Sequence, residues 1–489
     1  MSGDRAIASI VVAGDGIVGL SAAAAFALAL PSARITILAT GADPAALADR
    51  LSSSLPPIGR FHAAVGLNEH ELVRDGVATH LLGTRFDGWS ASGESWFHCF
   101  GSYGARAGTV DFHRIWARAR KAGSALPYHR YAAAAALAEA GKFVHPDQNP
   151  QSPLATYLYA LRLDPERYRA RMAEQCRSPR IDRIEGTPGG VDRREDGGIA
   201  ALHLADGRRI EADLFVDGAG PSSPLLSMLD DRFEDWSDSL PCDRLLLATE
   251  KAGGLSSCDL AVADETGWHW SAQLPEGTLT GRAYASALTA PTCEEDAETV
   301  KLRPGRRPDA WVRNVLAIGD AAIAVDPLQG TNLHLAQSAI LRALELLPGR
   351  DCHPLELREY NRRTAQETDR VRDFLALHYL RSGRSEGEFW QAAACGAVPD
   401  SLDRTLEQFE RRGRLPFYEE ETYDRHSWSA VLLGMGVLPR GTDAAAAGVD
   451  FAEAEAAMQR LAETVSALPG RLPAYRDYLA RMRGSAVAR

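Results

Sequence analysis

The chain has 489 residues, of which 45% are hydrophobic and 24% charged, a composition typical of folded globular proteins. Its formal net charge of −11 argues against a nucleic-acid partner, and no apolar run is long enough to span a membrane. The length is large for a single hydrophobic core and suits a domain that carries an inserted second domain.

The cysteine pattern indicates a reducing compartment. The total is odd and no CxxC pair occurs, which argues against a disulfide framework and against structural zinc. We therefore expect a cytoplasmic protein without a metal site. The seven residues are Cys99, Cys176, Cys242, Cys258, Cys293, Cys352 and Cys395.

The N-terminal part of the chain predicts a strand, a glycine turn and a helix. Residues 7–13 are apolar and β-branched, and residues 20–30 form an alanine-rich helical pattern. In such a turn, glycines permit a tight bend, close approach of a pyrophosphate and close helix–strand packing. We therefore expect a dinucleotide to bind at the turn. Its residues are Gly14-Asp15-Gly16-Ile17-Val18-Gly19.

Two features near this turn predict weaker dinucleotide binding. The second strand, expected over residues 34–38, ends in Ala39-Thr40, where a ribose-binding carboxylate is usual. Asp15 places a negative charge in the turn, which would repel a pyrophosphate unless the side chain points outward. The apolar run 17–30 also resembles a signal peptide, but the preceding strand and the glycine spacing argue against that alternative.

A second candidate motif follows an apolar strand in the middle of the chain. Residues 198–204 and 210–216 predict a hairpin around Gly207-Arg208. Its last strand runs into Asp217-Gly218-Ala219-Gly220. Alone this would be an ordinary strand exit, but its place between two other motifs makes it a candidate for a cofactor contact.

The third motif is the stretch 314–336, NVLAIGDAAIAVDPLQGTNLHLA. It predicts a strand over 315–318, a turn, and a helix that starts over 332–336. Free backbone N–H groups at a helix start suit a polyol or phosphate ligand. We expect Asp320 to accept hydrogen bonds from ribityl hydroxyls, and Pro327 and Thr331 to form a wall for a flat ring. The cofactor contacts predicted here are Gly319, Asp320, Pro327, Thr331 and Asn332.

The remaining periodicity predicts an α/β fold. Residues 78–100 and 240–290 alternate like strands, whereas 60–65 and 110–140 are helical. Further helices are predicted over 333–347, 355–380, 386–393, 403–412 and 452–468. We expect a Rossmann-like GxGxxG box over residues 1–345, with inserted substrate-facing segments at about 60–110 and 240–310, and a mainly α-helical region over 346–489.

The three motifs resemble the fingerprints of the flavin-dependent tryptophan halogenase family, and the resemblance covers nearly the whole chain. Further matching stretches are Pro56-Pro57-Ile58, Arg85-Phe86 with Trp89, Gly267-Trp268-His269-Trp270, Glu359-Tyr360-Asn361 and Trp428–Gly436. The resemblance implies an FAD-binding box, a helical pyramid, and a tunnel between flavin and substrate. Trp268 and Trp270 would guard this tunnel or pack in an aromatic core.

The resemblance also implies a reaction and its partners. Family members accept reduced FAD from a separate flavin reductase and use oxygen to oxidise a halide. The hypohalous species is held by a lysine and attacks an electron-rich aromatic ring, free or peptide-borne. A homodimer is compatible with this expectation.

The chain departs from the family pattern at the residues that carry its chemistry. The family lysine position is Leu81, and no lysine precedes Lys121. The family carboxylate position is Gln329, which cannot serve as a base at neutral pH. Gly330 and Asn332 replace a serine and a glycine of the same turn.

Other positions bear on the same question. Leu51-Ser52 stand where the family has Gly-Glu, which adds to the case for altered flavin binding. The histidines that could take over a catalytic role are His80, His269 and His334, although a histidine within a strand or helix is more often structural.

Three functions stay open on the sequence. The first is an FAD-dependent oxidoreductase, either monooxygenase-like or an atypical halogenase, acting on an aromatic substrate. The second is a flavoprotein whose FAD is structural or regulatory. The third is a degenerate, cofactor-free partner of an active homologue. The intact glycines and Gly319-Asp320 favour the first two, whereas Ala39, Asp15 and Asn332 favour the third.

Overall fold

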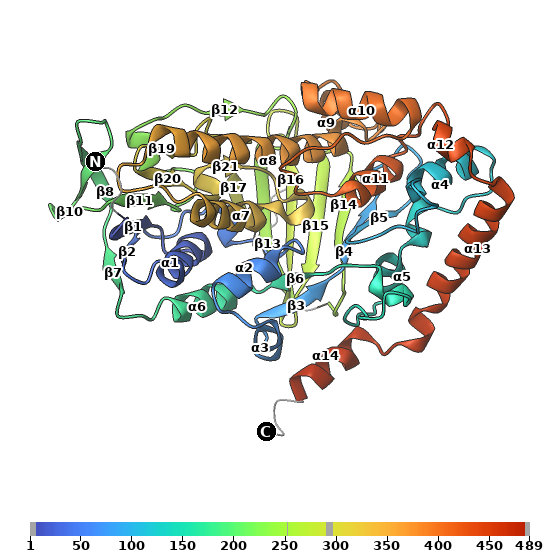
Figure 1. Cartoon of the computed structure of the whole chain (residues 1–489), viewed down its shortest axis with the longest axis horizontal. Helices are drawn as coiled ribbons and strands as arrows, with labels where there is room; N and C mark the ends of the chain where they lie inside the picture. Colours follow the sequence, from blue (N-terminus) through green and yellow to red (C-terminus); the bar gives the residue numbers. More distant parts are fainter. Residues whose placement is uncertain (1–5, 252, 290–296, 485–489) are drawn as a thin grey trace. The chain divides into compact units, whose positions relative to one another are not determined.

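The computed structural model describes residues 6–251, 253–289 and 297–484, so Cys293 and part of the predicted insert 240–310 lie outside the described residues. The chain divides into two compact units, each made of three segments of the sequence. Figure 1 labels their helices and strands. Unit 1 comprises Met1–Ala78, Leu163–Ser237 and Val300–Asp369, and unit 2 comprises Thr79–Arg162, Asp238–Thr299 and Arg370–Arg489. The domain boundary at residue 345 stays a prediction.

A six-stranded sheet forms the centre of unit 1. Its strand order is β19-β20-β11-β1-β2-β7, and all strands except β19 run parallel. Buried, apolar strands such as β1 and β11 are typical of a parallel sheet that is covered on both faces. The strands are β1 (Ser9–Ala13), β2 (Arg34–Ala39), β7 (Ile181–Glu185), β11 (Leu214–Asp217), β19 (Trp311–Val312) and β20 (Val315–Ala317).

The hairpin predicted over residues 198–216 is only partly right. Strand β9 (Ile199–Leu204) pairs with the short β10 (Arg209–Ile210) and with β8 (Pro188–Arg193) in a separate three-stranded sheet. Strand β11 lies instead in the central sheet, parallel to β1 and β20. Its residues 214–217 are all buried, whereas an outer hairpin strand buries only one face.

Helix α1 (Ile17–Ala29) begins three residues earlier than predicted, directly after Gly16. Residues 17–27 are buried on every side of the helix, because α1 packs against the sheet, α6 (Pro165–Gln175) and α7 (Thr331–Glu345). The remaining regular elements of unit 1 are α2 (Ile58–Ala64), α3 (Glu69–Arg74), and a small sheet of β12 (Glu234–Asp235), β18 (Gly305–Arg306) and β21 (Ile323–Ala324). Helix α8 (Pro354–Leu380) starts in unit 1 and continues into unit 2.

Unit 2 is built around a seven-stranded sheet of order β17-β13-β16-β15-β14-β4-β5. Strands β14 and β4 pair in parallel, and the pairs from β13 to β14 are antiparallel. The strands are β4 (Gly83–Asp87), β5 (Trp96–Cys99), β13 (Arg244–Lys251), β14 (Asp259–Asp264), β15 (Gly267–Gln273), β16 (Gly277–Tyr284) and β17 (Glu298–Lys301). Strands β3 (Ala78–Leu81) and β6 (Ala160–Leu163) form a separate pair.

The helices of unit 2 confirm most of the helical periodicity. Within the predicted stretch 110–140 the chain forms two helices and a 3₁₀ turn, η2 (Tyr128–Tyr131), in place of one continuous helix. The helices are α4 (Phe112–Lys121), α5 (Ala133–Glu139), α9 (Glu388–Ala394), α10 (Asp400–Arg412), α11 (Arg425–Gly434), α12 (Ala444–Ala447), α13 (Phe451–Ala467) and α14 (Tyr475–Gly484). Helices α11, α12 and α14 were not predicted from the sequence.

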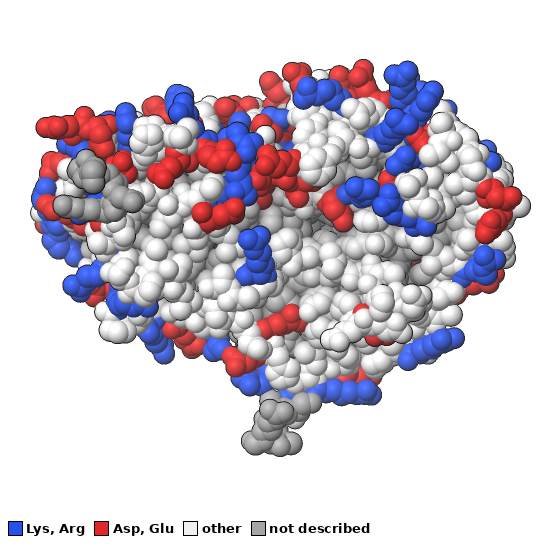
Figure 2. Space-filling model, viewed as in Figure 1, with Lys and Arg blue, Asp and Glu red and all other residues white. Residues whose placement is uncertain are grey.

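The described residues include no helix that is both long and apolar enough to cross a membrane. On the face that Figure 2 shows, acidic and basic side chains of the described residues are interspersed, and no continuous basic area is visible. The absence of a nucleic-acid partner stays a prediction from the net charge of −11.

Candidate functional site

The predicted glycine turn forms at the carboxyl end of β1. Gly14 adopts φ +101°, and a Cβ on it would lie 2.6 Å from the carbonyl oxygen of Gly218. A Cβ on Gly19 would lie 2.1 Å from the carbonyl oxygen of Gly14. Both positions therefore require glycine, the first for the bend and the second for close packing of α1 on the strand.

The three predicted motifs lie together in unit 1. They follow β1, β11 and β20, which are neighbours in the parallel sheet. Gly218 lies against Gly14, and a Cβ on Gly319 would lie 3.1 Å from Cγ1 of Val18. Ligands of open parallel sheets bind at the carboxyl ends of the strands, so the fold places all three motifs where such a ligand would bind.

Asp15 does not leave an unbalanced charge in the turn. Its Oδ2 lies 3.0 Å from Arg169 and 2.8 Å from Arg183, which belong to α6 and β7 of the same unit. These two guanidinium groups compensate the carboxylate. The repulsion between Asp15 and a bound diphosphate is therefore smaller than we expected from the sequence.

The end of β2 lacks a carboxylate, as expected from Ala39-Thr40. Ala39 is buried, and its partner in the parallel register is Glu185 at the end of β7. An acidic residue at this level of the sheet thus comes from the neighbouring strand, which the sequence pattern did not reveal.

Asp320 is buried in the short 3₁₀ helix η5 (Gly319–Ala321) after β20. Its Oδ2 accepts a hydrogen bond of 2.9 Å from the N–H of Ala48. Burial raises the pKa of this carboxyl to about 8, and the nearby Asp49 adds to the shift. Its role as a ligand of ribityl hydroxyls stays a prediction.

Asp49 is a site residue that the sequence analysis missed. Its Oδ1 accepts a hydrogen bond of 2.8 Å from the N–H of Val18 in the first turn of α1. Burial raises its pKa to about 6. The only sequence signal is that two acids, Asp43 and Asp49, stand in the loop after the second strand.

The segment predicted to form a wall for the flat ring of the cofactor contains a turn with positive φ angles. Gln329 and Gly330 both adopt φ +66° in η6 (Leu328–Gly330), directly before α7. Nδ2 of Asn332 donates to the carbonyl of Val325 at 2.9 Å. Among the described residues, Oδ1 of Asn332 and Oγ1 of Thr331 are buried without a hydrogen-bond partner. Such atoms call for a polar ligand or water.

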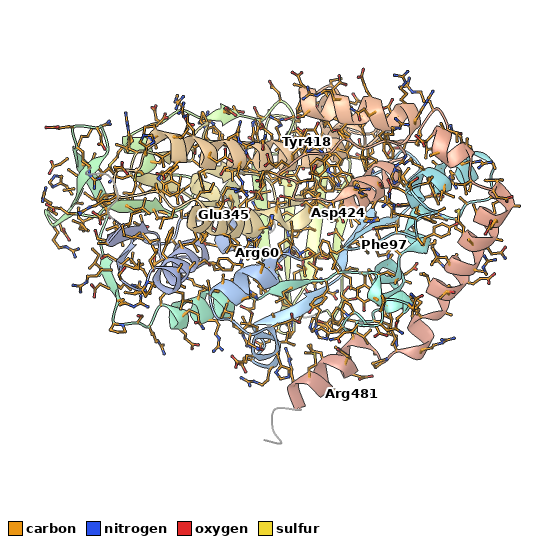
Figure 3. All side chains as sticks on the ribbon, in the orientation of Figure 1. Arg60, Phe97, Glu345, Tyr418, Asp424 and Arg481 are labelled. Carbon is orange, nitrogen blue, oxygen red and sulfur yellow. The ribbon has the colours of Figure 1, made fainter. Side chains whose placement is uncertain are left out.

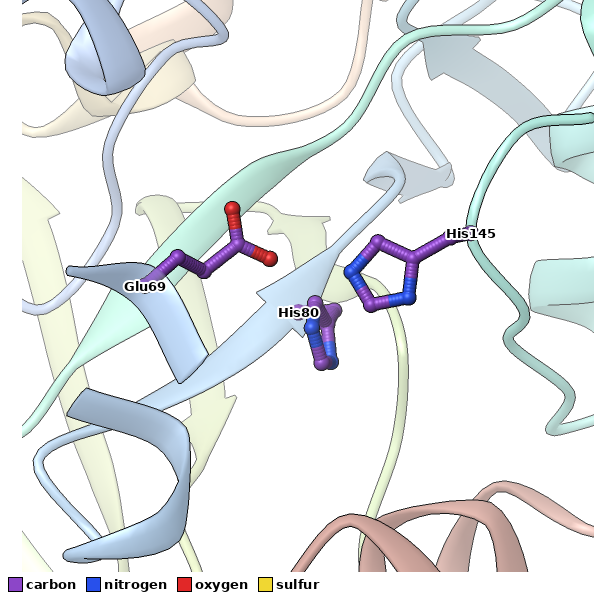
Figure 4. Close-up of side chains that lie close together, drawn as sticks. All are labelled: Glu69, His80 and His145. Carbon is purple, nitrogen blue, oxygen red and sulfur yellow. The ribbon is translucent and has the colours of Figure 1, made fainter. Parts of the chain in front are cut away.

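In unit 2, the residue predicted to occupy the position of the family lysine is apolar and enclosed. Leu81 ends β3 and is 2% exposed. The neighbouring His80 is stacked on Phe143, with ring centroids 4.1 Å apart, and its Nδ1 lies 3.1 Å from the hydroxyl of Tyr475. Figure 4 shows the imidazoles of His80 and His145 edge to face, 4.9 Å apart. These contacts are those of a structural histidine.

The two tryptophans of β15 share one face of the strand. Their ring centroids are 5.3 Å apart, and the indole N–H of Trp268 donates to the hydroxyl of Tyr379 at 2.9 Å. Trp268 also packs against Trp89. Trp268 is buried in the core, whereas Trp270 is only partly buried and lines a cavity of about 390 Å³. A role of Trp268 and Trp270 at a tunnel stays a prediction.

His269 and His334, the other two candidate catalytic histidines, each lie beside a carboxylate. His269 is half exposed, and its Nδ1 is 3.5 Å from Asp264. His334, in unit 1, is 3.5 Å from Glu367, which also binds Arg342. Burial raises the pKa of Glu367, but the hydrogen bond from His334 and the charge of Arg342 hold it at about 2.

Unit 2 contains a cavity of about 630 Å³ that the sequence analysis did not identify. Tyr418 and Asp424, both labelled in Figure 3, belong to its lining. The guanidinium of Arg370 lies 4.0 Å from the ring centroid of Tyr418 and 4.3 Å from that of Trp428. Further lining residues are Arg114, Arg414, Phe417, Glu421, Tyr423 and Arg425. Aromatic walls with charged groups suit a flat, polar ligand.

Similar proteins share this architecture. A flavin-dependent halogenase from Brevundimonas sp. BAL3 superposes with a TM-score of 0.90 at 32% identity, covering 98% of this chain and 100% of that one. One from Xanthomonas campestris has a TM-score of 0.90 at 29% identity, covering 98% and 99%. A tryptophan 6-halogenase from Streptomyces toxytricini is 30% identical over 297 residues, 56% of each chain. A second curated relative, a 7-chloro-L-tryptophan 6-halogenase from a Kutzneria species, matches over 61% of its length.

These matches confirm the resemblance seen in the sequence. The model of the tryptophan halogenase family matches residues 9–450 of the chain. The mixed α/β architecture with a helical C-terminal region also agrees with the expected fold class. The chain therefore belongs to the tryptophan halogenase family, whose cofactor is FAD supplied in reduced form by a separate flavin reductase.

Proposed function

We propose that the chain is an FAD-dependent oxidoreductase that acts on an aromatic substrate, as a monooxygenase or as an atypical halogenase. The observation that carries the proposal is the glycine turn at the carboxyl end of β1, with Gly319 and Asp320 beside it. Gly14 and Gly19 keep the tight strand–helix turn that dinucleotide-binding folds use at the carboxyl end of a parallel sheet.

The residues of unit 1 fit FAD in two respects. The turn leaves no room for side chains on Gly14, Gly16 and Gly19 and presents N–H groups at the start of α1, which suits a diphosphate. The buried Oγ1 of Thr331 and Oδ1 of Asn332 are available to a polar ring. Reduced FAD, when bound, supplies the electrons with which oxygen is activated.

Transfer of a halogen through a lysine is not part of the proposal. The side chain of Leu81 can neither donate a hydrogen bond nor form a chloramine. Gln329 cannot remove a proton at neutral pH. His80, next to Leu81, is held in an aromatic stack. Oxygenation does not need these groups, and this difference favours monooxygenase-type chemistry or an altered halogenation.

An aromatic substrate is supported by the cavity of unit 2. Tyr418, Tyr423 and Trp428 line this cavity, and the guanidinium of Arg370 lies over the rings of Tyr418 and Trp428. Arg414 and Arg425 also line it and are paired with Asp443 and Asp111. The names of the matched relatives indicate tryptophan for those enzymes. Both small indoles and peptide-borne rings belong in the substrate screen.

The test combines the full chain with FAD, a flavin reductase, NADH, oxygen and either chloride or bromide. Tryptophan and a panel of other aromatic compounds are offered, and products are identified by mass spectrometry. We expect no monohalogenated tryptophan and an oxygenated or halogenated product from another ring. Robust halogenation of tryptophan would refute the argument from Leu81 and Gln329. A colourless protein without product or peroxide would instead support the non-catalytic partner.

A further inference from the structure

The short helix η1 (Leu47–Asp49) lies on all three elements that carry the predicted cofactor contacts. It packs against α1, against η5 and against α7, and all four elements belong to unit 1. Residues of η1 therefore meet the groups that the sequence assigns to the diphosphate and to the ribityl chain.

The side chain of Asp49 fills the space above the glycine turn. Its Oδ1 accepts the hydrogen bond from the N–H of Val18 at 2.8 Å. Its Oδ2 lies 1.8 Å from the point that a Cβ on Gly16 would occupy. The carboxylate thus rests directly on the backbone of the turn, at the N-terminus of α1.

A diphosphate would need the same place. In a dinucleotide-binding turn, the pyrophosphate lies at the helix N-terminus and accepts hydrogen bonds from its N–H groups. The N–H of Val18 already donates to Asp49. Two anions at one position also repel each other. The carboxylate of Asp49 and a bound diphosphate therefore exclude each other.

The neighbouring residue holds the second contact point. The N–H of Ala48 donates to Oδ2 of Asp320, the predicted ligand of the ribityl chain, at 2.9 Å. In the same loop, Oδ1 of Asp43 accepts a hydrogen bond from the N–H of Ala45 at 2.9 Å. Ala48 and Asp49 together thus engage both contact points that FAD would use.

We propose that Asp49 is an internal competitor of FAD that sets the affinity of the chain for the cofactor. Its carboxylate caps α1 until a diphosphate replaces it, and Ala48–Asp49 must leave the turn before FAD binds there. A competitor of this kind suits a cofactor that is exchanged with a separate reductase. The inference rests on FAD as the cofactor and is independent of the substrate and of the reaction.

The first test measures the dissociation constant of FAD by quenching of flavin fluorescence on the full chain. Asp49→Ala should bind FAD about tenfold more tightly, because one charge-assisted hydrogen bond no longer competes. Asp75→Ala is the matched control, since it removes an exposed carboxylate of unit 1 that is paired with Arg74. Its dissociation constant should stay within about twofold of the wild type, because exposed charges are screened.

Two further probes separate competition for phosphate from a general loosening of the loop. ADP carries the diphosphate, and its affinity should rise in Asp49→Ala as that of FAD does. Riboflavin carries no phosphate, and its affinity should stay unchanged. An equal gain for riboflavin would overturn the proposal, as would FAD binding no more tightly to Asp49→Ala than to the wild type.

A measurement on the wild-type chain covers the case in which Asp49→Ala fails to fold. Addition of FAD should accelerate hydrogen exchange at Ala48, because its N–H loses the hydrogen bond to Asp320. Unchanged or stronger protection of Ala48 with FAD bound would contradict the proposal. Asp49→Asn keeps the size of the side chain without its charge, and its affinity for FAD should lie between those of the wild type and Asp49→Ala. No substrate is present, so a failed activity assay has no bearing on these results.

Discussion

Asp320 shows how the fold acts on a single carboxyl group. It is buried beside Asp49, another carboxyl, and its Oδ2 accepts a hydrogen bond from the N–H of Ala48. Burial makes the charged form costly, so the pKa rises from 3.8 to about 8. The residue is expected to carry a proton at neutral pH, when it could donate as well as accept a hydrogen bond.

The stability of the chain should therefore depend on pH through Asp320. Its pKa is higher in the folded state, so its contribution is complete below the unfolded pKa of 3.8 and is lost as the pH rises to about 8. Asp320→Asn removes this dependence. The stability of the variant relative to wild type should increase between about pH 5 and pH 8, by up to about 1.4 kcal/mol per pH unit.

Urea unfolding at several pH values measures this difference. Asp75→Asn is the control, because the hydrogen bond from Arg74 lowers the pKa of Asp75 and both states are ionised over that range. A stability difference between Asp320→Asn and wild type that does not change with pH would show that the carboxyl is ionised in the folded chain.

At the scale of elements, the contacts between two elements determine which substitutions their junction tolerates. The β1–α1 junction is closed by Gly19, whose Cα faces the carbonyl of Gly14. Strand β6 is held to β14 by Arg162, which is 0% exposed and binds Asp259 and two carbonyl groups. A side chain cannot be added at Gly19 without a steric clash. The side chain of Arg162 cannot be removed without a loss of stability.

The glycine junction predicts a contrast between two substitutions by alanine. Gly19→Ala should destabilise the chain by about 1–3 kcal/mol, because the methyl group overlaps the carbonyl of Gly14. Gly59→Ala, in the exposed part of α2, meets no atom and should stabilise by up to about 1 kcal/mol through helix propensity. Denaturant midpoints measure both. Equal effects would mean that the turn relaxes to admit a side chain.

The buried ion pair predicts a second contrast. Arg162→Met should cost about 3–5 kcal/mol, because Asp259 is left buried without its partner. The double variant Arg162→Met with Asp259→Asn should recover part of this loss. The control Arg34→Met breaks the exposed pair with Asp182 and should cost less than about 1 kcal/mol. A small effect of Arg162→Met in thermal or urea unfolding would show that water reaches Asp259.

At the scale of the whole molecule, the predicted functional residues are divided between the two units. Unit 1 holds the three motifs predicted to contact FAD, and unit 2 holds Leu81 and the aromatic cavity. The family fold is kept over the full length, with a TM-score of 0.90 to a flavin-dependent halogenase. The chain thus shares the architecture of the family, whereas Leu81 and Gln329 stand at the positions predicted for the lysine and the carboxylate.

Introducing a lysine at position 81 and a carboxylate at position 329 should permit halogen transfer to tryptophan. The double variant Leu81→Lys with Gln329→Glu should raise monohalogenation of tryptophan about a hundredfold above the background. Leu82→Lys with Gln329→Glu is the matched control, because Leu82 is also buried and lies one position away. Mass spectrometry in the reductase-coupled assay measures the product. A folded, FAD-binding double variant without product would show that more than these two residues has been lost.

Features that depend on neighbouring residues can be predicted from the amino-acid sequence alone. The glycine turn was predictable because Gly14 and Gly19 are required by the local path of the chain. The central strands were predictable because residues 10–13 and 214–216 are uniformly apolar. The family, and with it the fold class and the cofactor, followed from the order of three such local motifs.

Contacts between residues far apart in the sequence became visible in the folded chain and not before. Asp15 is compensated by Arg169 and Arg183, which lie more than 150 residues away. Asp49 reaches Val18 because the loop after β2 folds back onto α1, and no periodicity records such a return. His80 became structural through Phe143 and Tyr475. Side-chain pairs of this kind are fixed by packing across the whole fold, so they cannot be derived from local sequence.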